Sequence, residues 1–246
     1  MRPVWVLLGD SLTQRSFEPS GWGASLVNAY SRSIDVQCRG YSGYNSRWVL
    51  GLLPTILPLD KPGPPPQLLI LCLGANDACL PDRSSAKQHV PLEEFKANLA
   101  AIVQHARRLG VANILVLTPG PVHEPTRLTH ALQTRGLALE SAERTAAVSG
   151  AYAAAAAEVA HSLSLPSINL WTGFSQRPGW ETELLCDGLH FSSAGQTLVG
   201  DWVREAIAAH FPTLTPQALP WEGPDHTDID GERWEACLAS GGGKHP

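Results

Sequence analysis

The sequence predicts an α/β fold, a three-layer α/β/α sandwich in which helices cover both faces of a five-stranded parallel sheet. Continuous apolar runs at residues 5–8, 68–73 and 114–117 are typical of strands that are buried on both faces. Segments with helical spacing separate the strands, and this alternation favours a parallel sheet. A chain of 246 residues can bury one core of this kind. We therefore expect one domain over residues 1–211, followed by a surface tail over residues 212–246.

Each element has its own signal in the sequence. Strands are predicted at residues 5–8, 34–38, 68–73, 114–117 and 167–170. Helices are predicted at residues 21–32, 48–53, 91–109, 136–164 and 194–210. The alanine-rich segment 136–164 is one helix or two abutting ones, because Ser149 and Gly150 could interrupt it. The tail is proline-rich and polar, with one short helix at residues 232–238 and with Trp221 and Trp234 as anchors onto the domain.

Short polar residues follow the apolar strands. Asp10 and Ser11 come directly after the first strand, and Asn76 follows the third. In open α/β sheets the site lies beyond the carboxyl ends of the strands, so Ser11 is a candidate nucleophile. Taken alone, each of these residues is also a common turn or helix-capping residue. Their joint occurrence with Asp187 and His190, which precede the last helix of the domain, favours the functional interpretation.

Composition excludes several classes of function. The net charge of −5 gives no basic field, so nucleic acid is not an expected partner. Five cysteines without a C-x-x-C pair argue against a disulfide framework or a zinc knuckle, and the histidines show no metal-ligand spacing. No glycine-rich nucleotide-binding motif is present, so we expect no cofactor and no metal.

The sequence also predicts the cellular location of the protein. The first strand opens at Pro3, which leaves no room for a leader segment, and no apolar run reaches the roughly 20 residues of a membrane-spanning helix. We expect a cytoplasmic protein without membrane insertion. The sequence leaves open whether the chain forms a homodimer.

Four blocks in order resemble the signature blocks of the GDSL, or SGNH, hydrolases. They are Gly9 to Leu12, Gly43 in its loop, Gly74 to Asp77, and Asp187 to His190. Within that family, longer runs around Gly43, His89, Asn76 and His190 resemble the isoamyl acetate-hydrolysing esterases. The resemblance implies a flavodoxin-like sheet of the SGNH-hydrolase type, and it covers the chain from about Val4 to Phe211.

The resemblance also implies roles for individual residues. Ser11 would be the nucleophile, His190 the general base, and Asp187 the acid that orients His190. The backbone N–H groups of Ser11 and Gly43 and the side-chain amide of Asn76 would form the oxyanion hole. Asp10 and Asp77 we assign to support, accepting hydrogen bonds from loop N–H groups. Candidate pocket-lining residues are Tyr44, Val122 and Phe191.

The leading hypothesis is a serine esterase that hydrolyses small carboxylic esters, such as acetates, through an acyl-enzyme. The acetate preference and a role in lipid degradation rest on the family resemblance. Two alternatives remain open. One is a deacylase of acetylated carbohydrates or lysophospholipids on the same framework, and the other is a non-catalytic α/β module.

Overall fold

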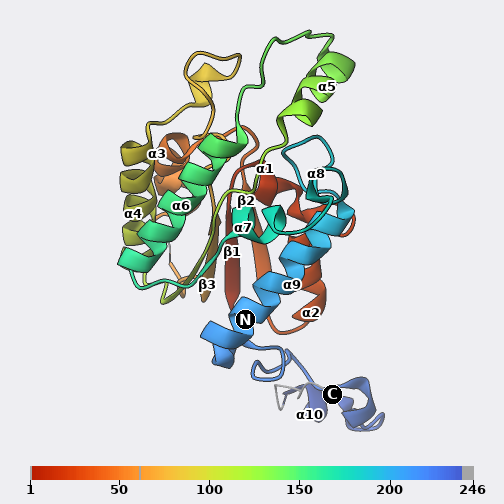
Figure 1. Ribbon diagram of the computed structural model, residues 1–246. Coiled ribbons are helices and arrows are strands. Elements are labelled where there is room, and N and C mark those ends of the chain that lie inside the picture. Colours follow the sequence, from red (N-terminus) through yellow and green to blue (C-terminus); the bar gives the residue numbers. More distant parts are fainter. Residues whose placement is uncertain (1, 61, 240–246) are drawn as a thin grey trace.

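Five parallel strands form the centre of the protein, in the order β2-β1-β3-β4-β5 (Figure 1). The computed structural model describes residues 2–60 and 62–239. The strands are β1 Val4–Gly9, β2 Asp35–Gly40, β3 Leu68–Cys72, β4 Asn113–Leu117 and β5 Ser167–Ile168. This strand order is flavodoxin-like, and the direction of winding reverses between β1 and β3. The predicted sheet is confirmed, and its switch point lies where Ser11 and Asn76 follow their strands.

Strand β1 shows why helices are needed on both faces. Trp5 and Leu7 belong to one buried cluster, while Val6 and Leu8 point to the opposite face and belong to a second cluster. The first face is covered by α2 Trp22–Ala29, α7 Leu170–Ser175 and α9 Ser193–His210. The second face is covered by α3 Ser46–Ile56, α4 Leu92–Arg108 and α6 Ala146–Ser162. Figure 1 shows the two helical layers on either side of the sheet.

The remaining helices of the described chain lie in the connections and in the tail. They are α1 Ser11–Gln14, α5 Glu124–Arg135, α8 Trp180–Glu183 and α10 Trp234–Ala239. Single 3₁₀ turns are η1 Arg15–Phe17, η2 Ala86–Gln88, η3 Pro212–Leu214 and η4 His226–Asp228. Helices α5 and α8 lie beyond the carboxyl ends of the strands, at the top of Figure 1. No helix in the described part of the chain is both long and apolar enough to cross a membrane.

The prediction for residues 136–164 is wrong in its first ten residues. Helix α6 starts only at Ala146, because the Thr145 side chain caps it by accepting a hydrogen bond from the Val148 N–H at 3.2 Å. Residues 136–145 form a loop, and the preceding α5 was not predicted. The helix continues through Gly150, where a side chain would press on the Trp171 ring, 3.1 Å from the position of a Cβ.

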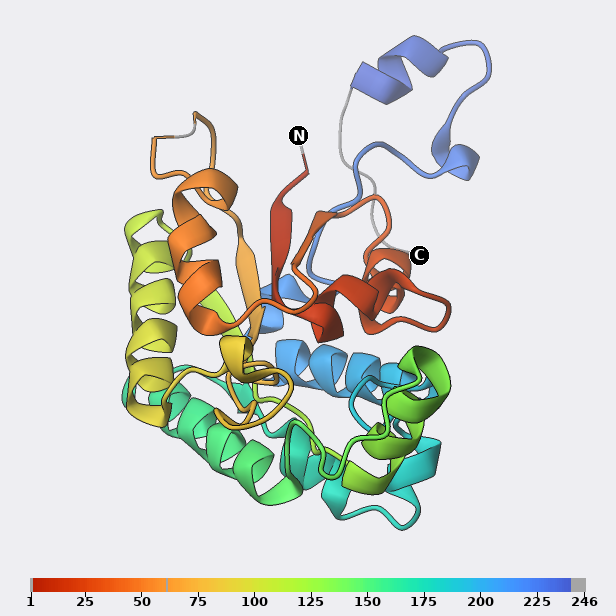
Figure 2. The same cartoon turned by 90° about the horizontal axis from the view of Figure 1, so that it is seen from above.

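The tail packs against the amino ends of the strands. The Arg32 guanidinium lies 4.3 Å from the centre of the Trp221 ring and donates a hydrogen bond to the Gly223 carbonyl oxygen at 3.0 Å. Trp221 is therefore an anchor, as predicted, whereas Trp234 is 50% exposed. The predicted short helix is present as α10, which projects away from the sheet (Figure 2). Residues 240–246 of the predicted tail lie outside the described residues.

Candidate active site

Ser11 is the first residue of α1 and follows β1 after a single residue. The intervening Asp10 caps α1, since its Oδ1 accepts a hydrogen bond from the Leu12 N–H at 2.9 Å. The Trp22 ring N–H donates to the Leu12 carbonyl oxygen at 3.1 Å, which ties α1 to α2. The short turn is therefore held at both ends, and it presents Ser11 beyond the carboxyl edge of the sheet with 4% of the residue exposed.

Asp187 and His190 come from one tight loop between α8 and α9. His190 Nε2 lies 2.9 Å from Ser11 Oγ, and His190 Nδ1 lies 2.7 Å from Asp187 Oδ2. Gly188 makes the turn possible because its φ of +80° is in the left-handed region, and a Cβ there would lie 2.6 Å from the His123 carbonyl oxygen. The structure thus brings the three predicted residues into one hydrogen-bonded chain.

The surroundings of Asp187 favour its ionised form. Its Oδ1 accepts hydrogen bonds from the backbone N–H groups of Leu189 at 3.0 Å and His190 at 2.8 Å. Burial alone would raise the pKa of Asp187, but the hydrogen bonds and charge of His190 and the cation of Arg127 outweigh burial and hold this pKa well below its usual value. The carboxylate is therefore available as an acceptor for the His190 ring.

Asn76 lies in the turn after β3, which ends at Cys72. Its Nδ2 donates a hydrogen bond to the Tyr44 carbonyl oxygen at 2.8 Å, and its Oδ1 accepts one from Arg144 Nη2 at 2.8 Å. An amide nitrogen carries two hydrogens, so one remains for a bound group. Asn76 is 3% exposed, so its donor works in a nearly water-free setting.

Gly43 lies in the loop that connects β2 to α3. Its φ is +80°, which a residue with a side chain would rarely adopt. The Gln88 side chain donates to the Gly43 carbonyl oxygen at 2.9 Å and thereby holds the peptide plane of this residue. The structure therefore places Gly43 in a loop conformation that depends on the absence of a side chain, and its role as an oxyanion donor stays a prediction.

Asp10 and Asp77 support the loops, as predicted. Asp77 Oδ1 accepts a hydrogen bond from the Ser46 N–H at 2.9 Å, which fixes the start of α3. Burial raises the pKa of Asp10 to about 7, although the hydrogen bond from Leu12 lowers it. Burial likewise raises the pKa of Asp77 to about 6, although the hydrogen bonds from Ser46 lower it. Both carboxyl groups accept hydrogen bonds from backbone N–H groups, and neither is hydrogen-bonded to Ser11 Oγ.

Three charged residues near the site were not predicted. Arg127 lies on α5, and Glu143 and Arg144 lie in the loop before α6, each less than a tenth exposed. They join Asp187 to Asn76 through a continuous set of ion pairs and hydrogen bonds. Charged residues usually lie in solvent, so no spacing in the sequence marks these three as buried.

Two of the suggested pocket-lining residues belong to the core instead. Val122 and Phe191 are 1% and 3% exposed, and the Phe191 ring packs against Phe174 with ring centres 5.1 Å apart. Phe191 directly follows His190, but the side chains of both Val122 and Phe191 belong to the core. Tyr44 is partly buried and contributes its backbone carbonyl to Asn76.

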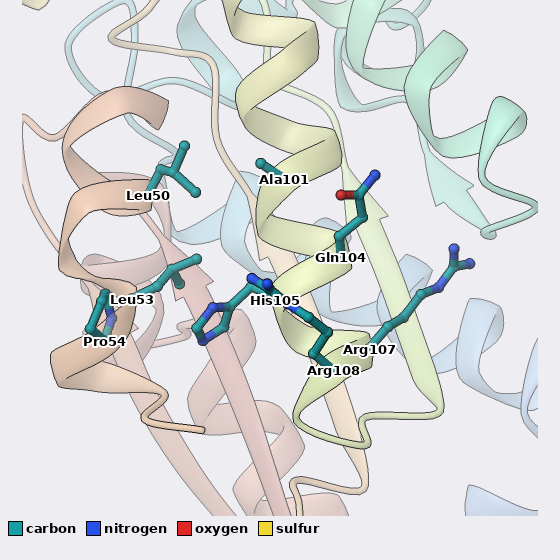
Figure 3. A pocket seen from close by; sticks show the side chains of 8 residues that line it. All are labelled: Leu50, Leu53, Pro54, Ala101, Gln104, His105, Arg107 and Arg108. Atoms are coloured by element: carbon teal, nitrogen blue, oxygen red, sulfur yellow. The ribbon is translucent and has the colours of Figure 1, made fainter. Parts of the chain in front are cut away.

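A groove lies between α3 and α4, and its lining includes none of the proposed triad or oxyanion residues (Figure 3). It has a volume of about 540 Å³ and is lined by Leu50, Leu53, Pro54, Ala101, Gln104, His105, Arg107 and Arg108. His105 Nε2 lies 2.7 Å from the Leu57 carbonyl oxygen, so its ring is engaged in holding α3 to α4. Across residues 2–60 and 62–239, no group of three or more His, Cys, Asp or Glu side chains is arranged to hold a metal ion.

Comparison with known proteins agrees with this geometry. The model of the GDSL-like lipase/acylhydrolase family matches residues 7–198. A GDSL esterase/lipase of Arabidopsis thaliana is 42% identical over 94% of this chain and 96% of its own length. An isoamyl acetate-hydrolyzing esterase 1 homolog of Bos taurus is 39% identical over 97% of this chain and 94% of its own length.

Solved structures show the same fold at lower identity. A lipase/acylhydrolase of Enterococcus faecalis superposes with a TM-score of 0.63 at 24% identity, covering 85% of this chain and 96% of that one. An acetylxylan esterase of Geobacillus stearothermophilus superposes with a TM-score of 0.64 at 19% identity, covering 83% and 94%. The family match and the two close relatives carry the assignment: the chain belongs to the GDSL-like lipase/acylhydrolase family of ester hydrolases.

Proposed function

We propose that the protein hydrolyses small carboxylic esters through an acyl-enzyme formed on Ser11. The observation that carries the proposal is the chain of contacts from Ser11 Oγ to His190 Nε2 at 2.9 Å and from His190 Nδ1 to Asp187 Oδ2 at 2.7 Å. A hydroxyl needs such a base within hydrogen-bond reach to become a nucleophile. The carboxylate in turn holds the ring with its proton on Nδ1, which leaves Nε2 free to accept.

The reaction then follows in two halves. His190 Nε2 takes the proton of the Ser11 hydroxyl while Oγ attacks the ester carbonyl carbon, and Asp187 stabilises the resulting imidazolium. The tetrahedral intermediate collapses, the C–O bond to the alcohol breaks, and the alcohol leaves with the proton from Nε2. Water repeats the sequence on the acyl-enzyme, giving the carboxylic acid and restoring Ser11.

The negative charge on the carbonyl oxygen needs donors that are already in place. The backbone N–H groups of Ser11 and Gly43 and the free hydrogen on Asn76 Nδ2 are suited to this role. The Asn76 amide stays neutral, so its donor strength does not change when the oxyanion forms. Because Asn76 is nearly buried, the interaction is weakened little by water.

The proposed substrates are acetates and other short-chain esters of small alcohols. Support comes from the Bos taurus relative, named as an isoamyl acetate-hydrolyzing esterase homolog, whose similarity extends over nearly the whole of both chains. The reaction that we propose draws every proton transfer and donor from this chain's own residues, without a cofactor. A role in lipid degradation and a cytoplasmic location stay predictions.

The test is a substrate panel measured on the wild type and on Ser11→Ala. We expect hydrolysis of isoamyl acetate and p-nitrophenyl acetate that falls off through butyrate, octanoate and laurate esters, and a loss of roughly 10³- to 10⁶-fold in kcat for Ser11→Ala. A fluorophosphonate should label Ser11 covalently in the wild type. A Ser11→Ala variant with near-normal turnover would show that another group is the nucleophile.

The same panel separates the alternatives. Faster turnover of acetylated xylo-oligosaccharides or of lysophosphatidylcholine than of simple acetates would favour a carbohydrate or lysophospholipid deacylase. Absence of both turnover and fluorophosphonate labelling would favour the non-catalytic module, in which the Ser11 turn is only a packing device.

A further inference from the structure

Three buried charged residues lie outside the proposed triad and oxyanion hole, and the reaction as described above does not use them. Arg127, Glu143 and Arg144 are 7%, 5% and 3% exposed. Burying charges is unfavourable unless they are paired and hydrogen-bonded. A cluster of this kind at an active site therefore calls for an explanation in terms of what its members hold.

Glu143 is the centre of the cluster. Its Oε1 accepts hydrogen bonds from Arg127 Nη2 at 2.7 Å and from Arg144 Nη1 at 2.6 Å. Burial raises the pKa of Glu143, but the two arginine cations outweigh burial and lower it below its usual value. One ionised oxygen thus positions both guanidinium groups at once.

The two guanidinium groups reach different parts of the proposed site. Arg127 Nη1 lies 3.1 Å from Asp187 Oδ2 and donates to the Asp187 carbonyl oxygen at 3.2 Å. Arg144 Nε donates to the Ala75 carbonyl oxygen at 2.6 Å, and its Nη2 donates to Asn76 Oδ1 at 2.8 Å. Arg127 therefore reaches the acid loop, and Arg144 reaches the turn that carries the oxyanion donor.

The contact to Asn76 has a direct chemical consequence. A side-chain amide can be turned by half a rotation, which exchanges its donor and acceptor, and an amide that is turned the wrong way would present oxygen to an oxyanion. A guanidinium has donors and no acceptor, so Arg144 pairs only with the amide oxygen. The Asn76 NH₂ is thereby left as the donor, with one hydrogen on the Tyr44 carbonyl oxygen and the second available to a bound group.

We propose that Arg144 is a positioning residue that fixes the Asn76 amide in its donor orientation, and that Glu143 and Arg127 tie this residue to the Asp187 loop. The proposal rests on the proposed ester hydrolysis, in which Asn76 donates to the oxyanion. Arg144 touches no reacting atom. Its effect on rate is transmitted through Asn76.

The test is a double-mutant cycle of Arg144→Lys with Asn76→Ala, assayed with p-nitrophenyl acetate. Lysine keeps the charge but lacks the planar fork that reaches Ala75, Asn76 and Glu143 together. We expect Arg144→Lys to lower kcat roughly 10- to 100-fold with little change in KM, since the oxyanion contact is made in the transition state. In the Asn76→Ala background the same substitution should lower kcat by less than about threefold.

The matched control is Arg204→Lys, which changes an exposed arginine on α9 that pairs with Asp201. Its kinetics should equal those of the wild type. Equal losses from Arg144→Lys in both backgrounds, or a loss confined to KM, would overturn the positioning role and leave Arg144 as a structural residue.

A second measurement does not depend on activity. The Asn76 side-chain ¹⁵N signal of the wild-type protein, assigned by its disappearance in Asn76→Ala, should relax like a rigid group, with an order parameter near about 0.85. A value below about 0.6 would mean that the amide is not held, and would overturn the inference. A wild type without esterase activity would instead refute the proposed function, and the relaxation result would still show whether the Asn76 amide is held rigidly.

Discussion

Replacing Asp187 by asparagine tests the proposed triad most sharply, because the structure dictates how the new amide must sit. Two backbone N–H groups, from Leu189 and His190, point at Oδ1 from 3.0 and 2.8 Å. The asparagine oxygen should keep that place. Its NH₂ then replaces Oδ2, 2.7 Å from His190 Nδ1 and 3.1 Å from Arg127 Nη1.

The consequence for His190 can be given a magnitude. The NH₂ donates to Nδ1, so the ring carries its proton on Nε2 and cannot accept the proton of Ser11. Flipping the amide would sacrifice two hydrogen bonds of about 0.5–1.5 kcal/mol each and set the NH₂ against two N–H groups. We therefore expect kcat/KM to fall about 10⁴-fold, the loss associated with a triad histidine held in the wrong tautomer, or about 5 kcal/mol.

The assay is kcat/KM for p-nitrophenyl acetate, measured beside thermal unfolding to separate lost chemistry from lost fold. Asp201→Asn is the matched control, because it removes the same charge from an exposed ion pair on α9 and should leave kcat/KM unchanged. A folded Asp187→Asn protein that keeps its activity within about tenfold of the wild type would refute the assignment of Asp187 as the residue that orients His190.

Two further substitutions test the loops around the site. Gly188→Ala should destabilise the fold by about 1–3 kcal/mol and lower kcat, because the new Cβ meets the His123 carbonyl oxygen at 2.6 Å, whereas Gly136→Ala, also at positive φ but with open space around it, should cost less in urea unfolding. Asp10→Asn should change the pH dependence of stability. Because the folded-state pKa of Asp10 is raised to about 7, folded wild type binds a proton that the unfolded chain has released, so its stability relative to Asp10→Asn should fall by about 2 kcal/mol from about pH 5 to about pH 7; a constant difference in urea unfolding would contradict this.

The sheet and the triad could be predicted because their signals are local. Strand β1 is a run of apolar residues, and Asp10 and Ser11 follow it directly. The parallel arrangement brings the carboxyl ends of β1 and β3 to one edge of the sheet. Asp187 and His190 are only three residues apart, so one turn of the backbone is enough to align them.

The loop before α6 could not be predicted, for a physical reason. Its residues have the composition of an amphipathic helix, and the helix starts where Thr145 caps it rather than where the alanine-rich pattern begins. Glu143 and Arg144 are buried here only because their partners, Arg127, Ala75 and Asn76, arrive from distant parts of the chain. Partners that lie far apart in the sequence form no recognisable pattern of spacing, so the cluster can be identified only from the structure.

The backbone N–H groups of Leu189 and His190 align the acid with the base within one turn, and Arg127 from α5 adds a contact to the Asp187 carboxylate. Residues Asp187 to His190 therefore form a short segment whose internal alignment is kept when the sheet shifts slightly. Assembly of the triad then needs one long-range contact, between His190 of this segment and Ser11, which lies 179 positions away in the sequence. A redesign of the fold that moved this segment would need to re-establish both its distance to Ser11 and its contact with Arg127.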